Sequence, residues 1–349
     1  MGTTADKLNK LLQTKAAIKT AIEAKGVTVG DAKFADYPTK IAAIEGGGGG
    51  TGVIEDYLNS QSLGYLIDEL LKVVQRSVSN HDTTKTLYQL VGDNNNGGII
   101  YANGCLPPND NQTVNYQKSL ISVRNVDFSN WSFTTVNARE FAFNNNLVEF
   151  SGVSTAASGE GITDFSKVAT AQMMFAATSL RDLKVYLPIA TNIGSLVSDC
   201  SYIKTVTIKT LGQSVDASYI FNRCYELEEV TLINELNVTT LQGFCFMCTK
   251  LNKINGIIDA SGVTNTNQFL DGSAAKLISE VWIKNLSTSI YITSPNFTKE
   301  CCLYMFNNAT TVTGNIVVIL NDAVYNNLTA DERAILTNKG FTLRGGATN

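Results

Sequence analysis

Apolar residues in the second half of the chain recur in a unit that combines two periods. In the stretch FNRCYELEEVTL, Phe221, Cys224 and Leu227 are three residues apart, which predicts one face of a short helical turn. Val230 and Leu232 follow two residues apart, which predicts a strand that buries one face. We take the position of Leu227 as the anchor of the unit, and it recurs at residues 147, 180, 203, 227, 251, 278 and 312.

The spacing of these anchors identifies a repeat. The interval from Ile203 to Leu227 equals the interval from Leu227 to Leu251, and the interval from Leu180 to Ile203 is one residue shorter. The outer intervals are longer and carry insertions such as residues 154–167. Units of roughly 20–29 residues with a strand and a helical turn are typical of leucine-rich-repeat coils. One unit cannot bury its own apolar face, so we expect the units to stack into a solenoid with a parallel sheet.

Cysteine recurs with the repeat. Three cysteines lie three residues before an anchor, namely Cys200, Cys224 and Cys248. The equivalent positions in the other units hold Asn144, Ala177, Ala275 and Ala309. Because free cysteine behaves as a small buried hydrophobe, these side chains are expected to form a ladder inside the stack.

A disulfide framework or a zinc site is the alternative use of these thiols. Cys245 and Cys248 form one close pair, but no second pair of cysteines or histidines completes a zinc site. Seven cysteines is an odd number, which disfavours a disulfide framework. Packing is therefore the preferred hypothesis, and no metal or cofactor is expected. The adjacent Cys301 and Cys302 are expected to divide between the inside and the outside of the stack.

The composition argues against several classes of function. The 349 residues include one histidine, His81, so a catalytic arrangement that needs a histidine base has only this candidate. The net charge of -4 and the lack of a basic block argue against a nucleic-acid partner. No apolar run approaches the length of a membrane span, and the N-terminus lacks the apolar region of a signal peptide. We therefore expect synthesis in a cytoplasm and no membrane insertion.

Residues 1–45 predict a small helical module. The helical pattern over residues 6–24 carries an apolar stripe formed by Leu8, Leu11, Ile18 and Ile22. Pro38 opens a second short helix, and residues 46–52 form a flexible glycine linker. The stripe is expected either to face a neighbouring protein, as an attachment surface, or to pack within the module.

Residues 53–80 predict an oligomerisation helix with a wide apolar arc. Its candidate contacts, spaced three, four and three residues apart, are Leu63, Leu66, Leu70 and Val73. A wide arc favours a bundle of three chains, so a homotrimer is expected. A helix that lies on its own domain is the alternative. Turn signals and short strand-like runs over residues 81–138 predict a small β-rich collar.

The end of the chain predicts a cap for the stack. Thr329 and Glu332 form a capping box for a helix over residues 329–339, and Gly340 ends that helix. The expected fold is therefore α+β: a helical module, an oligomerising helix, a β-rich collar, and a leucine-rich-repeat solenoid with its cap over residues 139–349.

Two resemblances accompany these patterns. The motif F-x-x-C-x-x-L-x-x-V-x-I, found over residues 139–320 with interruptions at Gly256 and Asn315, resembles the BspA-type leucine-rich repeats of bacterial surface proteins and phage virion proteins. This resemblance implies a binding scaffold without catalytic residues. The segment from DKLNKLL to residue 45 closely resembles a recurrent N-terminal module of phage tail and fibre proteins, which implies attachment to a virion.

These features predict a structural virion fibre, such as a tail fibre or spike. The fibre would be made in the host cytoplasm and would attach to tail or head proteins. Its solenoid is expected to bind a glycan or protein on the host surface, with Tyr291 and Phe297 as candidate contacts. Packing of these two aromatic side chains within their own loops is the alternative.

Two other functions remain as alternatives. One is a bacterial surface adhesin, which would need an export route. The other is a polysaccharide-degrading fibre, which would need paired carboxylates. The adjacent pairs Glu228–Glu229 and Asp331–Glu332 are expected to be solvated, so no enzymatic activity is expected.

Overall fold

The computed structural model of the protein describes residues 4–24, 26–33, 36–37, 40, 83–92, 100–108, 120–132, 141–270 and 277–346. The chain divides into two compact units, Met1–Ser79 and Asn80–Asn349, and each is described by itself. The predicted linker over 46–52 lies outside the described residues, as do His81, Ala275 and the predicted trimer contacts Leu63, Leu66, Leu70 and Val73.

The first unit contains helix α1 (Thr4–Glu23) and a segment that folds back on it. Ile22 is only 3% exposed and packs with Val29 and Tyr37, and Ile18 packs against the same cluster. Ile18 and Ile22 therefore serve the core of their own module. The prediction that the stripe faces a neighbour is wrong for Ile22. The side chains of Leu8 and Leu11 lie outside the described part, so for them it stays a prediction.

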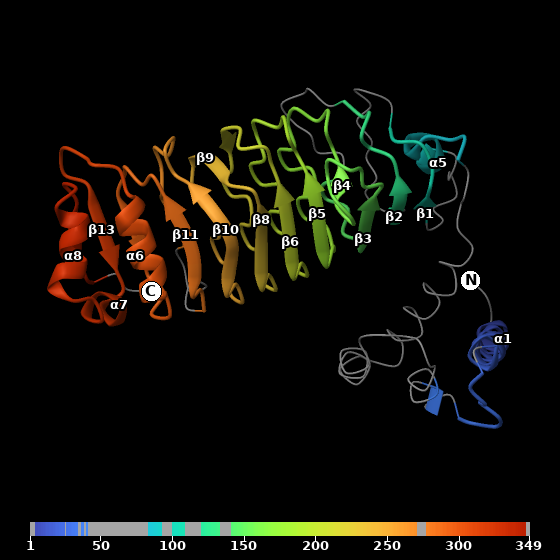
Figure 1. Ribbon diagram of the computed structural model, residues 1–349. Coiled ribbons are helices and arrows are strands. Elements are labelled where there is room, and N and C mark those ends of the chain that lie inside the picture. Colours follow the sequence, from blue (N-terminus) through green and yellow to red (C-terminus); the bar gives the residue numbers. More distant parts are fainter. Residues whose placement is uncertain are drawn as a thin grey trace. The chain divides into compact units, whose positions relative to one another are not determined.

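The second unit is a parallel β-solenoid (Figure 1). After the short helix α5 (Leu87–Gly92), the first sheet has the order β1 (Ile100–Asn103), β2 (Leu120–Val126) and β3 (Glu149–Gly152). A third sheet, at the other end, has the order β12 (Ile290–Ile292), β13 (Val317–Leu320) and β14 (Thr342–Arg344).

The sheet between them has the strand order β4-β5-β6-β8-β10-β9-β7, with β11 paired to β10. Its strands are β4 (Thr163–Asp164), β5 (Asp182–Tyr186), β6 (Thr205–Lys209), β7 (Val215–Asp216), β8 (Glu229–Ile233), β9 (Leu236–Thr240), β10 (Lys253–Asp259) and β11 (Glu280–Lys284). All strand pairs among these described elements are parallel. The predicted solenoid is thus confirmed at the level of a parallel β-stack.

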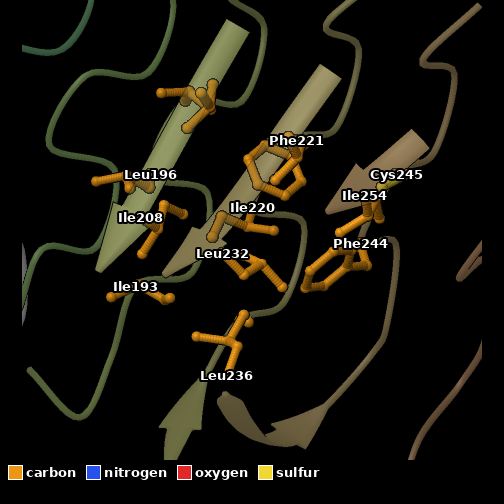
Figure 2. Close-up of a cluster of buried hydrophobic side chains, with 14 of the residues drawn as sticks. Ile193, Leu196, Ile208, Ile220, Phe221, Leu232, Leu236, Phe244, Cys245 and Ile254 are labelled. Atoms are coloured by element: carbon orange, nitrogen blue, oxygen red, sulfur yellow. The ribbon is translucent and has the colours of Figure 1, made fainter. Parts of the chain in front are cut away.

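Alternation along each strand fills the interior of this stack. On β6, Val206 and Ile208 point inward and are about 1% exposed. Figure 2 shows Leu196, Phe221 and Phe244 from successive coils in one cluster. One core runs from Leu87 to Phe341, so the described part of the predicted collar shares its core with the repeats.

Each coil returns through a series of turns rather than the predicted helical turn. The three-residue spacing does bury Phe221, Cys224 and Leu227, and the Cys224 N–H donates to Phe221 O over 3.2 Å. However, pairs of residues with positive φ interrupt each segment, namely Met173 and Ala177, Ser195 and Asp199, Tyr219 and Arg223, and Gly243 and Met247. These residues turn alternate N–H groups toward the next coil instead of along a helix.

The redirected N–H groups form a ladder between coils. Phe221 N donates to Phe244 O over 3.0 Å, and Arg223 N donates to Phe246 O over 2.8 Å. Bonds of the same kind run from residues 171–177 to the coil that follows, and then from residues 193–199 and 219–223 to the coils after them. This side of the solenoid therefore joins the coils by backbone hydrogen bonds, as the sheet does on the other side.

The cysteine ladder is buried, as predicted, and it also forms hydrogen bonds. Cys200 and Cys224 are fully buried and Cys248 is 2% exposed. Each thiol donates to a carbonyl of the preceding coil, over 3.0 Å to Phe175 O, 3.0 Å to Val197 O and 2.9 Å to Phe221 O respectively. All seven cysteines are free thiols.

The assignment of Ala177 to this ladder is wrong. Ala177 has a positive φ of 54° and matches Asp199, which has a φ of 62°. Thr178, one residue later, takes the ladder position. In this coil the ladder residue lies two residues before the anchor Leu180, whereas in the next coils it lies three residues before the anchor. Its hydroxyl donates to Phe175 O over 2.9 Å, and the Asn144 amide donates to Leu120 O over 3.0 Å. In these middle coils the position holds a short hydrogen-bond donor, whereas the buried Ala309 near the C-terminal end stays apolar as predicted.

The C-terminal cap contains more helix than predicted. Helix α8 (Ala330–Thr337) begins with the predicted capping box between Thr329 and Glu332, and β14 follows Gly340. Helices α6 (Lys299–Asn308) and α7 (Asp322–Asn326) lie in the same end of the stack (Figure 1). Cys301 and Cys302 are both buried in α6, so the predicted division between inside and outside is wrong.

Gly256 marks a bulge in β10. Ile254 pairs with Val281 and Ile257 pairs with Trp282, so two residues of β10 have no partner on β11. Gly256 has a φ of 103°, and a Cβ there would overlap the backbone oxygen of Leu232. This close approach explains why glycine interrupts the repeat at a strand position.

We expect Gly256→Ala to destabilise the protein by roughly 2–4 kcal/mol, since it combines a strained φ with a clash against backbone. Gly212→Ala is the matched control, because Gly212 has a φ of 81° and open space around it. The control should cost only about 1–2 kcal/mol. Chemical denaturation measures both, and equal losses would contradict the role given to the Leu232 contact.

Candidate functional site

The outward face of the long sheet carries a regular row of polar side chains. Lys184, Thr207, Thr231 and Asn255 pair in register on β5, β6, β8 and β10. Because parallel strands lie about 4.8 Å apart, these side chains are spaced by one strand along the stack. We call these four residues the outer strip.

Charges around the outer strip are largely neutralised by ion pairs between coils. Glu229 on one side of the strip is 3.5 Å from Lys253 on the next strand. Other pairs that join equivalent positions of neighbouring coils are Lys204–Glu228, Asp199–Arg223 and Glu226–Lys250. Their side chains are about half exposed, so each pair adds little stability. They join equivalent positions of neighbouring coils, whereas Lys184, at one end of the outer strip, forms no ion pair within the described residues.

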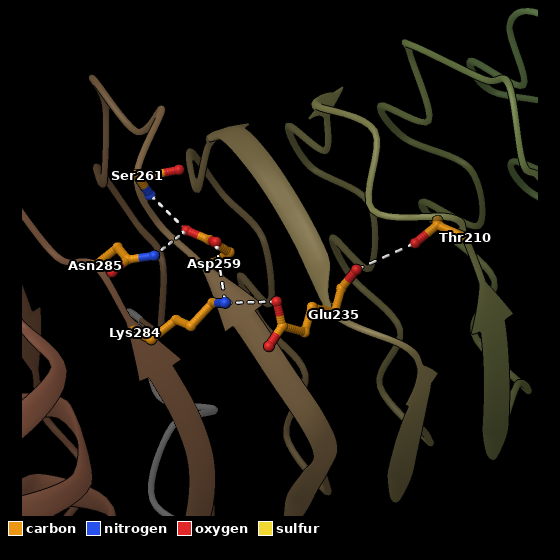
Figure 3. Close-up of polar contacts among 6 residues, drawn as sticks. All are labelled: Thr210, Glu235, Asp259, Ser261, Lys284 and Asn285. Atoms are coloured by element: carbon orange, nitrogen blue, oxygen red, sulfur yellow. Dashed lines mark hydrogen bonds and ion pairs between the residues drawn. The ribbon is translucent and has the colours of Figure 1, made fainter.

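A larger polar network lies at the C-terminal end of the sheet (Figure 3). The Lys284 ammonium bridges Asp259, 3.3 Å away, and Glu235. Asn285 Nδ2 and the Ser261 N–H each donate to Asp259 Oδ1 over 3.0 Å. Burial alone would raise the pKa of Asp259, but these hydrogen bonds together hold that pKa below its ordinary value. The network connects three successive coils through side chains at the C-terminal ends of β8, β10 and β11.

An insertion closes the other end of the face. Residues 154–162 lie between β3 and β4, in the predicted surface insertion, and Lys209 Nζ donates to Ser158 O over 3.2 Å. The Lys209 ammonium also lies 5.2 Å from the ring centroid of Tyr186, which is 5% exposed. The open part of the face therefore extends from β5 to β11.

The buried thiols are poorly suited to nucleophilic chemistry. Burial raises the pKa of Cys200 to about 11 and that of Cys302 to about 12. Since the thiolate is the reactive form, these side chains stay neutral at neutral pH. Within the described ranges, no group of three or more His, Cys, Asp or Glu residues could hold a metal ion.

The acidic pair Glu228–Glu229 has structural partners. Glu228 pairs with Lys204 on the preceding coil, and Glu229 pairs with Lys253 on the following coil. The two carboxylates thus face in opposite directions along the stack. Among the helices that the structure describes, none is long and apolar enough to cross a membrane.

The two predicted receptor contacts differ in accessibility. Tyr291 lies on β12 and is 54% exposed, so a contact there stays a prediction. Phe297 is 4% exposed and packs in the core, so its prediction as a receptor contact is wrong. The loop turns Phe297 inward just before α6, which agrees with the alternative that this aromatic side chain packs locally. Sequence reasoning missed the outer strip, although Thr207 and Thr231 occupy the same position in consecutive repeats.

Comparisons of the chain with protein-family models, with curated proteins and with solved structures returned no match in any of the three.

The lowered pKa of Asp259 makes a prediction about acid stability. A carboxyl whose pKa is lower in the folded state stabilises the fold above its ordinary pKa of about 3.8, and that contribution is lost as the pH falls further. We expect Asp259→Asn to cost about 1 kcal/mol at pH 7 and to lessen the loss of stability below pH 4. Asp182→Asn, on an exposed strand position, should change stability by less than about 0.5 kcal/mol. Denaturation at several pH values measures this, and identical pH profiles of Asp259→Asn and the unchanged protein would contradict the assignment.

Proposed function

We propose that the protein is a structural virion fibre, a tail fibre or related spike, whose solenoid contacts the host surface. The observation that carries this proposal is the division of roles within the second unit. Thiols and aromatic side chains pack in its interior, while mostly polar side chains lie in register on its outward face. Such an extended face suits binding to a large surface.

The N-terminal part of the chain supports attachment to a particle. Its first unit is a separate module with its own small core around Ile22. The resemblance of residues 5–45 to a module of phage tail and fibre proteins favours tail or head proteins as its partners. Residues 60–78 carry the helix pattern for which a homotrimer is proposed, and the location of the mature protein is then the virion.

The finer identity proposed for the solenoid is a BspA-type leucine-rich repeat. Three features support it: middle coils of nearly constant length, a short strand in each of them, and a ladder of cysteines at one fixed position. Each ladder thiol has a structural partner, which agrees with a scaffold whose function is binding rather than catalysis.

The test is to locate the protein and measure its adsorption. Antibody against the full chain should label fibres on purified particles by immunoelectron microscopy, and the soluble chain should compete with particles for host cells. Light scattering should give the mass of three chains. Label confined to the cell envelope would favour a bacterial adhesin instead. Chain that neither labels particles nor competes for adsorption would refute the fibre.

A further inference from the structure

Two hydroxyls at the centre of the outer strip form no hydrogen bond within the part of the chain that the structure describes. Thr207 and Thr231 are paired in register on β6 and β8, and their side chains are half-buried on the outward face. Neither hydroxyl bonds another described residue. Elsewhere in the solenoid, threonine hydroxyls do have partners, as at Thr178 and Thr239. The two free hydroxyls thus offer donors and acceptors to a ligand.

The electrostatic surroundings favour an uncharged ligand. Acidic and basic groups beside the strip pair with each other, as in Glu229–Lys253, and Lys284 pairs with both Asp259 and Glu235. Asn255 Nδ2 also donates to Glu229, which satisfies part of that carboxylate. Across β6, β8 and β10 these groups leave only a small net charge, so this part of the face exerts little attraction on an ionic polymer.

Apolar side chains lie on β10 and β11, at the end of the face beyond Thr231. Ile257 on β10 pairs in register with Trp282 on β11, and both side chains are half-buried. The Trp282 ring meets the Tyr304 ring of α6 edge to face, with centroids 5.2 Å apart. Hydroxyl groups beside partly exposed apolar groups match the alternating polar and apolar faces of a sugar ring.

We propose that the outer strip binds an uncharged glycan chain that runs along the stack across β6, β8 and β10. This inference rests on the proposed function and names the chemical class of the receptor. Adjacent strands present similar groups at intervals of about 4.8 Å, so a polymer of hydroxyl-bearing units can repeat its contacts from strand to strand. Proteins and acidic polymers are the competing ligands that the experiment must separate.

The experiment uses the full chain and the deproteinised polysaccharide of the host envelope, divided by anion exchange into a neutral and an acidic pool. The variant Thr207→Val with Thr231→Val removes both hydroxyls and keeps the branched shape that suits a strand. Thr310→Val is the control, since Thr310 is exposed in a segment away from the strip. Circular dichroism and thermal unfolding check that each variant is folded.

The neutral pool should bind with little dependence on salt, and the double variant should bind it about tenfold more weakly, as expected for the loss of two hydrogen bonds. The control should bind as the unchanged chain does. Binding of the acidic pool alone, of neither pool, or of the neutral pool equally by the double variant would overturn the inference. If the chain still adsorbs to host cells in those cases, the fibre proposal survives. If adsorption fails while the neutral pool binds through the strip, only the fibre proposal falls.

Discussion

Backbone hydrogen bonding between successive coils is the interaction on which the rest of this structure depends. A single coil has one short strand and a run of turns, and it cannot bury its apolar side chains alone. The strands join the coils on one side, and the ladder from Phe221 to Phe244 joins them on the other. Residues such as Tyr219 and Arg223 adopt positive φ to make this second ladder possible. The strain of each such residue, roughly 1–2 kcal/mol, is offset by hydrogen bonds that would otherwise be missing in a dry interior.

The position of the cysteines follows from this constraint. Where the turns end, a carbonyl of the preceding coil points into the interior, and a short side chain with a donor can reach it. Cys224 reaches Val197 O and Asn144 reaches Leu120 O, each on the preceding coil, whereas Thr178 donates to Phe175 O of its own coil. Two side chains of different chemistry thus link neighbouring coils from this position. The fixed register that results also aligns the outward side chains, which is why the outer strip recurs once in each coil from β5 to β10 and why ion pairs join equivalent positions of neighbouring coils.

The parts of the fold that depend on periodicity could be predicted from the sequence. The anchors, the strand alternation at Val206 and Ile208, and the capping box at Thr329 all depend on side-chain type at fixed spacing. The turn conformation could not be predicted in this way. A three-residue spacing fits a helical turn and a series of turns equally well, and Ser195 or Tyr219 gives no local signal of positive φ.

Other details depend on tertiary contacts. The placement of Thr178, rather than Ala177, in the ladder can be deduced only from the register between coils. The burial of Phe297 can be deduced only from the direction in which its loop enters α6. The candidate surface was missed for a related reason. Threonine on a strand has no distinctive signal, and its significance emerges only when neighbouring strands place Thr207 beside Thr231.

Alkylation of the thiols, followed by mass spectrometry, tests the central claim most directly. If the cysteines line a dry, hydrogen-bonded interior, then Cys200, Cys224 and Cys248 should resist alkylation in the native protein and react together when it unfolds. All seven cysteines should become modified in denaturant without a reducing agent. Rapid modification of any ladder cysteine in the native state, or cysteines that stay unmodified in denaturant until a reductant is added, would contradict the account.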